Sequence, residues 1–251
     1  SSISINGNEY TLGISLSGTP DGSETLTVNP VSSSIYDVVG NVASTSQSNN
    51  SISLNDKLAP TITGVTLASD NTTITVTFSE TVWNYDFNSS GSLEVTDFVF
   101  ALSGGDATLS STTPSSISIN GNEYTLGISL SGTPNGSETL TVNPASNSIY
   151  DLAGNVSSTS QSNNSISLND KLAPTMTISS TTVNSGESSN DSTISLTFTS
   201  SESTTNFIKD DITISSGSLS SLSGSGTTYT ATLTPSGDAT YTISVAQNKF
   251  T

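Results

Sequence analysis

Short runs of alternating apolar and polar residues recur along the chain and predict β-strands. Ile74, Val76 and Phe78 share one face of such a run, and Tyr124 and Leu126 share one face of another. A period of two is typical of half-buried strands. In the central part of the chain it predicts strands at residues 61–68, 72–80, 97–103, 107–119 with an interruption at Pro114, 122–130, 137–150 and 164–169.

The segments between these runs carry turn residues. Asn120 and Gly121 form a dipeptide that favours a two-residue hairpin, and residues 68–71 and 133–136 are rich in Asn, Asp, Pro and Gly. No segment shows the 3.6-residue period of a helix. Seven short strands with regular turns within roughly 110 residues are typical of an all-β, immunoglobulin-like sandwich.

The chain repeats itself at a distance of one whole domain. Residues 1–61 return as residues 115–175 with six substitutions, which are Asp21/Asn135, Val31/Ala145, Ser33/Asn147, Val38/Leu152, Val39/Ala153 and Ala43/Ser157. Solenoid repeats have periods of about 20–50 residues, so a period this long indicates a complete folding unit.

The repeat defines three segments, which we expect to form an elongated tandem array. Residues 58–171 make one complete Ig-like repeat, and residues 1–57 are the C-terminal part of an incomplete one. Residues 172–251 are a divergent repeat, because TISLTFTSSE (193–202) is similar to TITVTFSE (73–80). The sequence ends where this repeat should begin its last loop, so we expect it to lack its last strand. Both ends of the sequence fall inside a unit, so we expect the chain to be a piece of a longer polymer.

Composition and charge exclude several classes of function. The chain has 21 acidic residues against 4 lysines, a net charge of −17, which argues against nucleic acid and anionic membranes as partners. It has no Cys and no His, so it has no disulfide, no thiolate or imidazole metal site and no Ser-His-Asp or Cys nucleophile. No apolar run approaches the roughly 18 residues of a membrane span. We therefore expect neither an enzyme nor direct membrane insertion.

The acidic residues themselves indicate a cation. If successive strands alternate in direction, four carboxylates gather at the end where the chain enters the central repeat: Asp56 in the linker, Glu80 after the second strand, Asp97 before the third and Asp151 in the last loop. Calcium takes six to eight oxygen ligands. We predict a calcium ion at this junction. The alternative is that these acids terminate strands and face water.

The divergent repeat carries a similar set of acids, with Asp170 in its linker, Glu202 after its second strand, and Asp210 and Asp211 before its third. We predict a second calcium site from these four residues.

Trp83, Tyr85 and Phe87 lie together in a long loop, residues 81–95. Loops of this length are often functional. The three aromatic residues are therefore candidates for contact with a partner or a sugar. In the alternative interpretation they cover the end of the sandwich against the neighbouring domain.

The motifs YDLAGN (150–155), LNDKLAPTITGV (54–65) and ITVTFSETV (74–82) resemble the tandem bacterial Ig-like domains of giant secreted surface adhesins. The resemblance covers essentially the whole chain. It implies a location on the bacterial cell surface, a stalk-like role and calcium between domains at the acids named above. The linker departs from the family pattern in Lys57 and Lys171, which bring positive charge close to the predicted ions.

The sequence thus favours a structural stalk segment of a long extracellular bacterial adhesin or surface filament, stiffened by calcium at its domain junctions. Its partners would be the neighbouring repeats of the same chain. Two alternatives remain open. The units could themselves bind a carbohydrate or another cell-surface ligand, or copies of the filament could assemble laterally into a sheath or surface layer.

Overall fold

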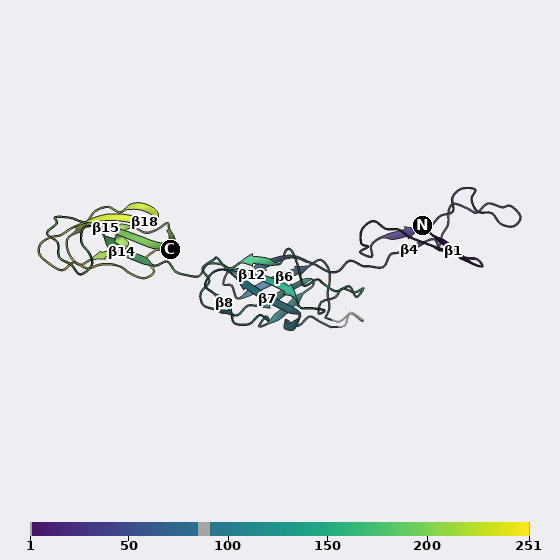
Figure 1. Cartoon of the computed structure of the whole chain (residues 1–251), viewed down its shortest axis with the longest axis horizontal. Helices are drawn as coiled ribbons and strands as arrows, with labels where there is room; N and C mark the ends of the chain where they lie inside the picture. The colour runs from purple at the N-terminus through teal and green to yellow at the C-terminus, as the bar shows by residue number, and fades with distance from the viewer. Residues whose placement is uncertain (1, 85–90, 251) are drawn as a thin grey trace. The chain divides into compact units, whose positions relative to one another are not determined.

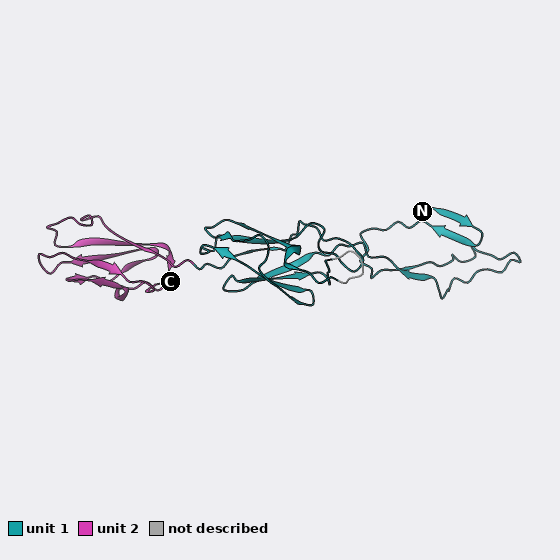
Figure 2. Ribbon diagram, turned by 90° about the horizontal axis from the view of Figure 1, so that it is seen from below, with its two compact units in different colours: residues 1–171 teal, residues 172–251 magenta. Residues whose placement is uncertain are grey.

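The structure, a computed structural model, describes residues 2–84 and 91–250. It divides into two compact units, residues 1–171 and residues 172–251 (Figure 2). In the described residues the only helical elements are two single 3₁₀ turns, η1 (Val95–Asp97) and η2 (Lys209–Asp211). The all-β class predicted from the alternation is confirmed.

Residues 58–171 form a sandwich of two antiparallel layers (Figure 1). One sheet has the order β5 (Ile62–Leu67), β6 (Thr73–Phe78), β10 (Glu123–Gly127), β9 (Ile117–Asn120). The other has the order β13 (Ser165–Ser167), β12 (Thr139–Pro144), β7 (Phe98–Ser103) and is accompanied by the pair β11 (Leu130–Ser131) and β8 (Thr108–Leu109). This is the ABED and GFC arrangement of immunoglobulin-like domains.

Two predicted strands are each divided in the structure. The run 107–119 becomes β8 and β9, and the run 122–130 becomes β10 and β11, so each segment contributes one strand to the four-stranded sheet and one to the separate β11–β8 pair. Pro114 has no N–H for a ladder and marks the first break. The second break follows Gly127, where a Cβ would lie 2.4 Å from the Ser115 hydroxyl oxygen. Alternation alone does not show such a change of sheet.

The core of the sandwich is shared between the two halves of the repeat. Tyr124, from the second half, packs edge-on against Phe78 at 5.7 Å and lies 6.1 Å from Phe98, both in the first half. Its hydroxyl donates a hydrogen bond to the carbonyl of Val82 at 3.3 Å. Neither half can bury these rings without the other.

Residues 2–57 form the same two antiparallel strand pairs as residues 116–171 but have no core. The pairs are β1 (Ile3–Asn6) with β2 (Glu9–Leu12), and β3 (Thr25–Thr27) with β4 (Ser51–Ser53). The registers are those of β9 with β10 and of β12 with β13, shifted by 114 residues. Tyr10, however, is 61% exposed, whereas its equivalent Tyr124 is 2% exposed. The hairpins are therefore encoded locally, and the core requires the first half of a repeat.

The C-terminal unit repeats the four-stranded sheet of the central sandwich and two strands of its second sheet. One sheet has the order β14 (Met176–Ser180), β15 (Ile194–Thr204), β18 (Ser223–Thr234), β17 (Ser218–Leu219), and the other pairs β16 (Ile212–Ile214) with β19 (Ile243–Val245). Phe207 packs between Phe198 at 5.8 Å and Tyr229 at 5.2 Å. The divergent sequence thus keeps the same fold.

Glu138 is fully buried between the two halves of the central repeat. Its carboxylate accepts hydrogen bonds from the backbone N–H groups of Asp106 and Ala107 at 3.0 Å and of Asn135 at 3.1 Å. Burial raises the pKa of Glu138, but the backbone donors outweigh it and the net pKa is lowered. Glu24, its equivalent in residues 2–57, is exposed and accepts from the Asp21 N–H at 3.2 Å.

We expect Glu138→Gln to lower the free energy of unfolding of the central sandwich by about 1–3 kcal/mol at pH 7, because an amide N–H₂ replaces one accepting oxygen. A lowered native pKa stabilises above the unfolded value, about 4.3, and this stabilisation is lost as the pH falls through the native pKa. Urea unfolding of the variant at pH 7 and at pH 3, followed by Trp83 fluorescence, measures both effects. Glu24→Gln is the matched control and should change neither; equal effects of the two substitutions would contradict the assignment.

Candidate metal centre

Three carboxylates from distant parts of the sequence meet where the chain enters the central sandwich. Asp56 lies in the linker after β4, Glu80 follows β6, and Asp151 lies in the loop after β12. One oxygen of each lies within 4.8 Å of the others. Asp151 is buried, and Asp56 and Glu80 are half-buried. All three are among the four residues that the sequence predicts at the first junction.

Asp151 is held by the tight turn of the YDLAGN motif. Its two carboxylate oxygens accept hydrogen bonds from the backbone N–H and the side-chain N–H of Asn155, both at 2.7 Å. Gly154 has a φ of +84°, which closes the turn. A carboxylate oxygen has two lone pairs, so each oxygen can still accept a second interaction.

The linker positions Asp56 through its backbone. The N–H of Lys57 donates to the carbonyl of Pro20 at 2.9 Å, and the N–H of Leu58 donates to the Asp56 carboxylate at 2.8 Å. Gly22 has a φ of +81°, and a Cβ on it would lie 3.2 Å from the Cβ of Asp56. The linker therefore rests on the loop at residues 20–22 of the preceding segment.

The charges of this cluster act on one another. The pKa of Glu80 is raised, first by burial and then by the negative charges of Asp151, Asp56 and Asp21. Asp21 was not among the predicted site residues. One signal for it was in the sequence, because Asp21 is one of only six positions at which the two copies differ, with Asn135 as its equivalent.

Asp97 lies outside the three-residue group. Its carboxylate turns back to accept a hydrogen bond from the N–H of Glu94 at 2.7 Å and closes the turn η1. The sequence position, immediately before β7, suited a ligand, but the side chain instead satisfies the backbone of its own turn. Its predicted role as a metal ligand has no support in this geometry.

The second predicted set is divided between the two units, with Asp170 in the first and Glu202, Asp210 and Asp211 in the second. Within its unit, Asp211 accepts a hydrogen bond from the N–H of Ile208 at 3.0 Å and closes η2, as Asp97 closes η1. The second calcium site stays a prediction.

Of the three aromatic residues, Tyr85 and Phe87 lie outside the described residues. Trp83 is half-buried, and its N–H and carbonyl both bond to the backbone of Tyr150, at 2.8 Å each. This bridge joins the segment after Glu80 to the segment before Asp151. Trp83 thus helps to set the distance between two of the carboxylates, and its contact with a partner stays a prediction.

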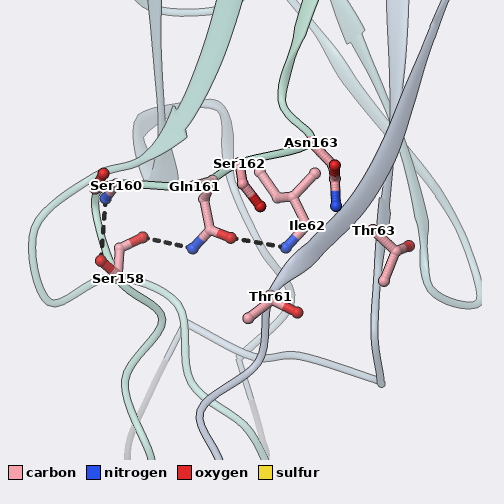
Figure 3. A pocket seen from close by; sticks show the side chains of 8 residues that line it. All are labelled: Thr61, Ile62, Thr63, Ser158, Ser160, Gln161, Ser162 and Asn163. Carbon is pink, nitrogen blue, oxygen red and sulfur yellow. Dashed lines mark hydrogen bonds between the residues drawn. The ribbon is translucent and has the colours of Figure 1, made fainter.

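A shallow pocket lies beside the start of β5 (Figure 3). The Gln161 side chain crosses it, accepting from the N–H of Ile62 at 2.9 Å and donating to the carbonyl of Ser158 at 2.8 Å. The lining is Thr61, Ile62, Thr63, Ser158, Ser160, Gln161, Ser162 and Asn163. It contains no aromatic ring on which a sugar could stack, and Gln161 serves to satisfy the strand edge.

The strand orders of the central sandwich and of the C-terminal unit define the class of the protein, an immunoglobulin-like β-sandwich protein. Residues 170–251 match the family model of the bacterial Ig-like domain, which confirms the resemblance for this segment. Comparisons with curated proteins and with solved structures gave no match. Domains of this family are usually extracellular or surface modules and are typically not enzymes. In the described residues, no helix is long and apolar enough to cross a membrane.

We expect the raised pKa of Glu80 to give a pH dependence in the presence of a chelator. A carboxylate with a raised native pKa binds its proton more tightly when folded, so stability falls as the pH rises from the unfolded value through the native one. Glu80→Gln should remove this fall and stabilise the protein at pH 7 by about 0.5–1 kcal/mol, a value reduced by solvent screening. Thermal unfolding between pH 4 and 7 measures it. The exposed Glu123→Gln serves as control; a variant less stable than the parent in chelator would contradict the electrostatic argument.

Proposed function

We propose that this chain is a stalk segment of an extracellular bacterial adhesin or surface filament, in which calcium at a domain junction fixes the incoming linker to the next sandwich. The observation that carries the proposal is the meeting of Asp56 with Glu80 and Asp151. One ligand belongs to the linker and two belong to the domain that it enters. An ion bound to all three would therefore limit the bending between successive repeats.

The donor set suits a hard cation. All three side chains offer oxygen, and two oxygens that bind one calcium ion at about 2.4 Å lie at most about 4.8 Å apart, a limit that this group meets. Bidentate carboxylates, backbone carbonyls and water could supply the remaining ligands. Magnesium requires a nearly ideal octahedron at shorter distances, so a cluster from three separate segments favours calcium.

Electrostatics also supports a cation. Asp21, Asp56 and Asp151 all raise the pKa of Glu80, which means that the folded junction holds like charges close together. The whole chain has a net charge of −17 and has no arginine to compensate it. A divalent ion would convert this repulsion into a bond between linker and domain.

The architecture, rather than a binding surface, supports the stalk role. The central sandwich and the C-terminal unit each have their own hydrophobic core, so stability is roughly additive along such an array. The pocket beside the start of β5 has no aromatic ring in its lining. Trp83 is hydrogen-bonded through its backbone to the backbone of Tyr150. These observations favour the stalk over the carbohydrate-binding alternative. Lateral assembly would appear as oligomers in solution.

We expect calcium to stabilise the central sandwich by about 2.7 kcal/mol when its concentration is 100 times the dissociation constant, and chelator to abolish the gain. Asp151→Asn and Glu80→Gln should each lose the calcium-dependent gain, although Glu80→Gln is the more stable protein without calcium. Glu123→Gln should retain it. Calorimetry with and without calcium measures this, and an equal gain in parent and Glu80→Gln would exclude the site.

The stalk function makes a separate prediction about flexibility. Small-angle scattering of the full chain should show a longer maximum dimension and a narrower distribution of distances in calcium than in chelator. Glu80→Gln should behave in calcium as the parent behaves in chelator. If calcium binds but the scattering does not change, the ion is bound and the stiffening role is wrong.

A further inference from the structure

The turn between β5 and β6 contains a residue in an unusual backbone conformation. Asn71 is one of four described residues other than glycine with a positive φ, +62°, and its N–H donates to the carbonyl of Ala68 at 3.0 Å. Glycine takes a positive φ at the lowest cost, so asparagine at this position indicates that the side chain itself has a role. Asn71 is also only 3% exposed, although it lies in a hairpin turn. Another segment of the chain must therefore cover it.

The covering segment is the outgoing linker, which we define as residues 168–171, directly after β13. The Asn71 side-chain N–H donates to the carbonyl of Asn169 at 2.8 Å. Its side-chain oxygen accepts from the backbone N–H and the side-chain N–H of Asn169, both at 2.9 Å. The Asn169 side chain also donates to the carbonyl of Ala68 at 3.1 Å. These hydrogen bonds join a turn and a linker that are 98 residues apart in the sequence.

The residues on either side of Asn169 are held by a second loop. The N–H of Leu168 donates to the carbonyl of Glu138 at 2.9 Å, and the N–H of Lys171 donates to the carbonyl of Pro134 at 2.8 Å. The outgoing linker is thus bonded to the turn at residues 68–71 and to the loop at residues 134–138. Two separate attachments fix the direction of a short segment, whereas one would leave it free to rotate.

Asp170 lies between these attachments. A Cβ on Gly136 would lie 3.2 Å from the Cβ of Asp170, as a Cβ on Gly22 would lie 3.2 Å from the Cβ of Asp56. The loop before the linker therefore presents Asp170 in the same way as Asp56, which belongs to the three-carboxylate group. Holding the outgoing linker also holds a predicted metal ligand.

The charges next to Asn71 agree with this contact. The pKa of Asp70 is lowered, first by the hydrogen bonds that Thr72 donates and, as a smaller cause, by the positive charge of Lys171. The Lys171 charge therefore acts on the turn that holds the outgoing linker, and the attraction between the two residues favours the bound position of this linker.

We propose that Asn71 is a positioning residue for the outgoing linker, which it holds against the end of the central sandwich in the absence of calcium. The proposal rests on the stalk role, because a fixed direction of the linker matters only where successive domains must keep their orientation. It adds an attachment of a different kind. At the metal centre a cation would fix the incoming linker to the domain that it enters, whereas here hydrogen bonds fix the outgoing linker to the domain that it leaves.

The consequence for bending follows from the length of chain between attachments. Residues 172–174 separate Lys171 from Thr175, whose N–H donates to the Ser201 hydroxyl oxygen at 2.9 Å. One of these three residues is Pro174, whose ring fixes its φ. Loss of the contact between Asn71 and Asn169 would extend the bendable segment back towards Leu168.

The test compares Asn71→Gly with the parent in the full chain and in excess chelator. Glycine keeps the positive φ of the turn and removes only the side chain, so the β5–β6 hairpin should persist. We expect the N–H of Asn169 to exchange with deuterated water about tenfold faster or more, because it loses its acceptor. Small-angle scattering should show a broader distribution of distances than the parent gives in the same buffer. Asn71→Asp keeps the accepting oxygen and should restore part of the protection of this N–H.

The matched control is Asn164→Ala. Asn164 is also 3% exposed, and its side-chain N–H donates to the carbonyl of Val142 at 2.7 Å, within the sandwich. This variant should lower the midpoint of thermal unfolding as Asn71→Gly does, but leave the exchange at Asn169 and the scattering unchanged.

Three results would overturn the positioning role. The first is unchanged exchange at Asn169 in Asn71→Gly, and the second is equally fast exchange in Asn164→Ala, which would show a general loss of stability. The third is faster exchange with unchanged scattering, because the contact would then not direct the linker. The calcium-dependent stiffening fails independently, if calcium does not change the scattering of the parent, since every comparison of Asn71 variants is made in chelator.

Discussion

The contact between the two halves of the repeat is the interaction on which the rest of the structure depends. Tyr124 from the second half closes over Phe78 and Phe98 from the first, and all three rings are buried. This contact also sets the metal centre, because Glu80 follows the strand of Phe78 whereas Asp151 belongs to the second half. Without the shared core, the two carboxylates would have no fixed separation. Fold and site therefore form together.

The duplication separates what a segment specifies by itself from what its context adds. Hairpin registers and the Asp–Asn turn are the same in residues 2–57 and 116–171, so they depend only on local sequence. Burial of Tyr124 and the hydrogen bonds from Asp106 and Ala107 to Glu138 exist only where residues 58–114 are present. The same sequence is a set of exposed hairpins in one place and half of a sandwich in the other. The hydrophobic core and the buried hydrogen bonds of Glu138 are thus non-local.

Strand positions could be predicted from alternation because a half-buried strand requires it. The division of two strands between the sheets could not, because it depends on the close approach at Gly127 and on the missing N–H of Pro114. Similar limits apply to the site. Counting strand directions placed Asp56, Glu80 and Asp151 at one end, but it could not reveal that the Asp97 side chain turns towards the N–H of Glu94. Topology fixes where a residue lies, and local hydrogen bonding decides where its side chain points.

Near-identity of adjacent repeats has a physical cost as well as a use. Identical cores let one segment fit more than one partner, which favours exchange between molecules during folding. The linker of this chain opposes exchange within a molecule. Asn169 bonds to Asn71 and to the carbonyl of Ala68, and Ala68 is separated from Pro60 by about eight extended residues, roughly 25 Å. The five residue steps from Asn55 to Pro60 reach at most about 18 Å, so Asn55 cannot take the place of Asn169. The short linker therefore has two effects. It holds Asp56 close to Glu80 and Asp151 of the next sandwich. It also means that within one molecule residues 58–114 can pack on residues 115–171 but not on residues 2–57.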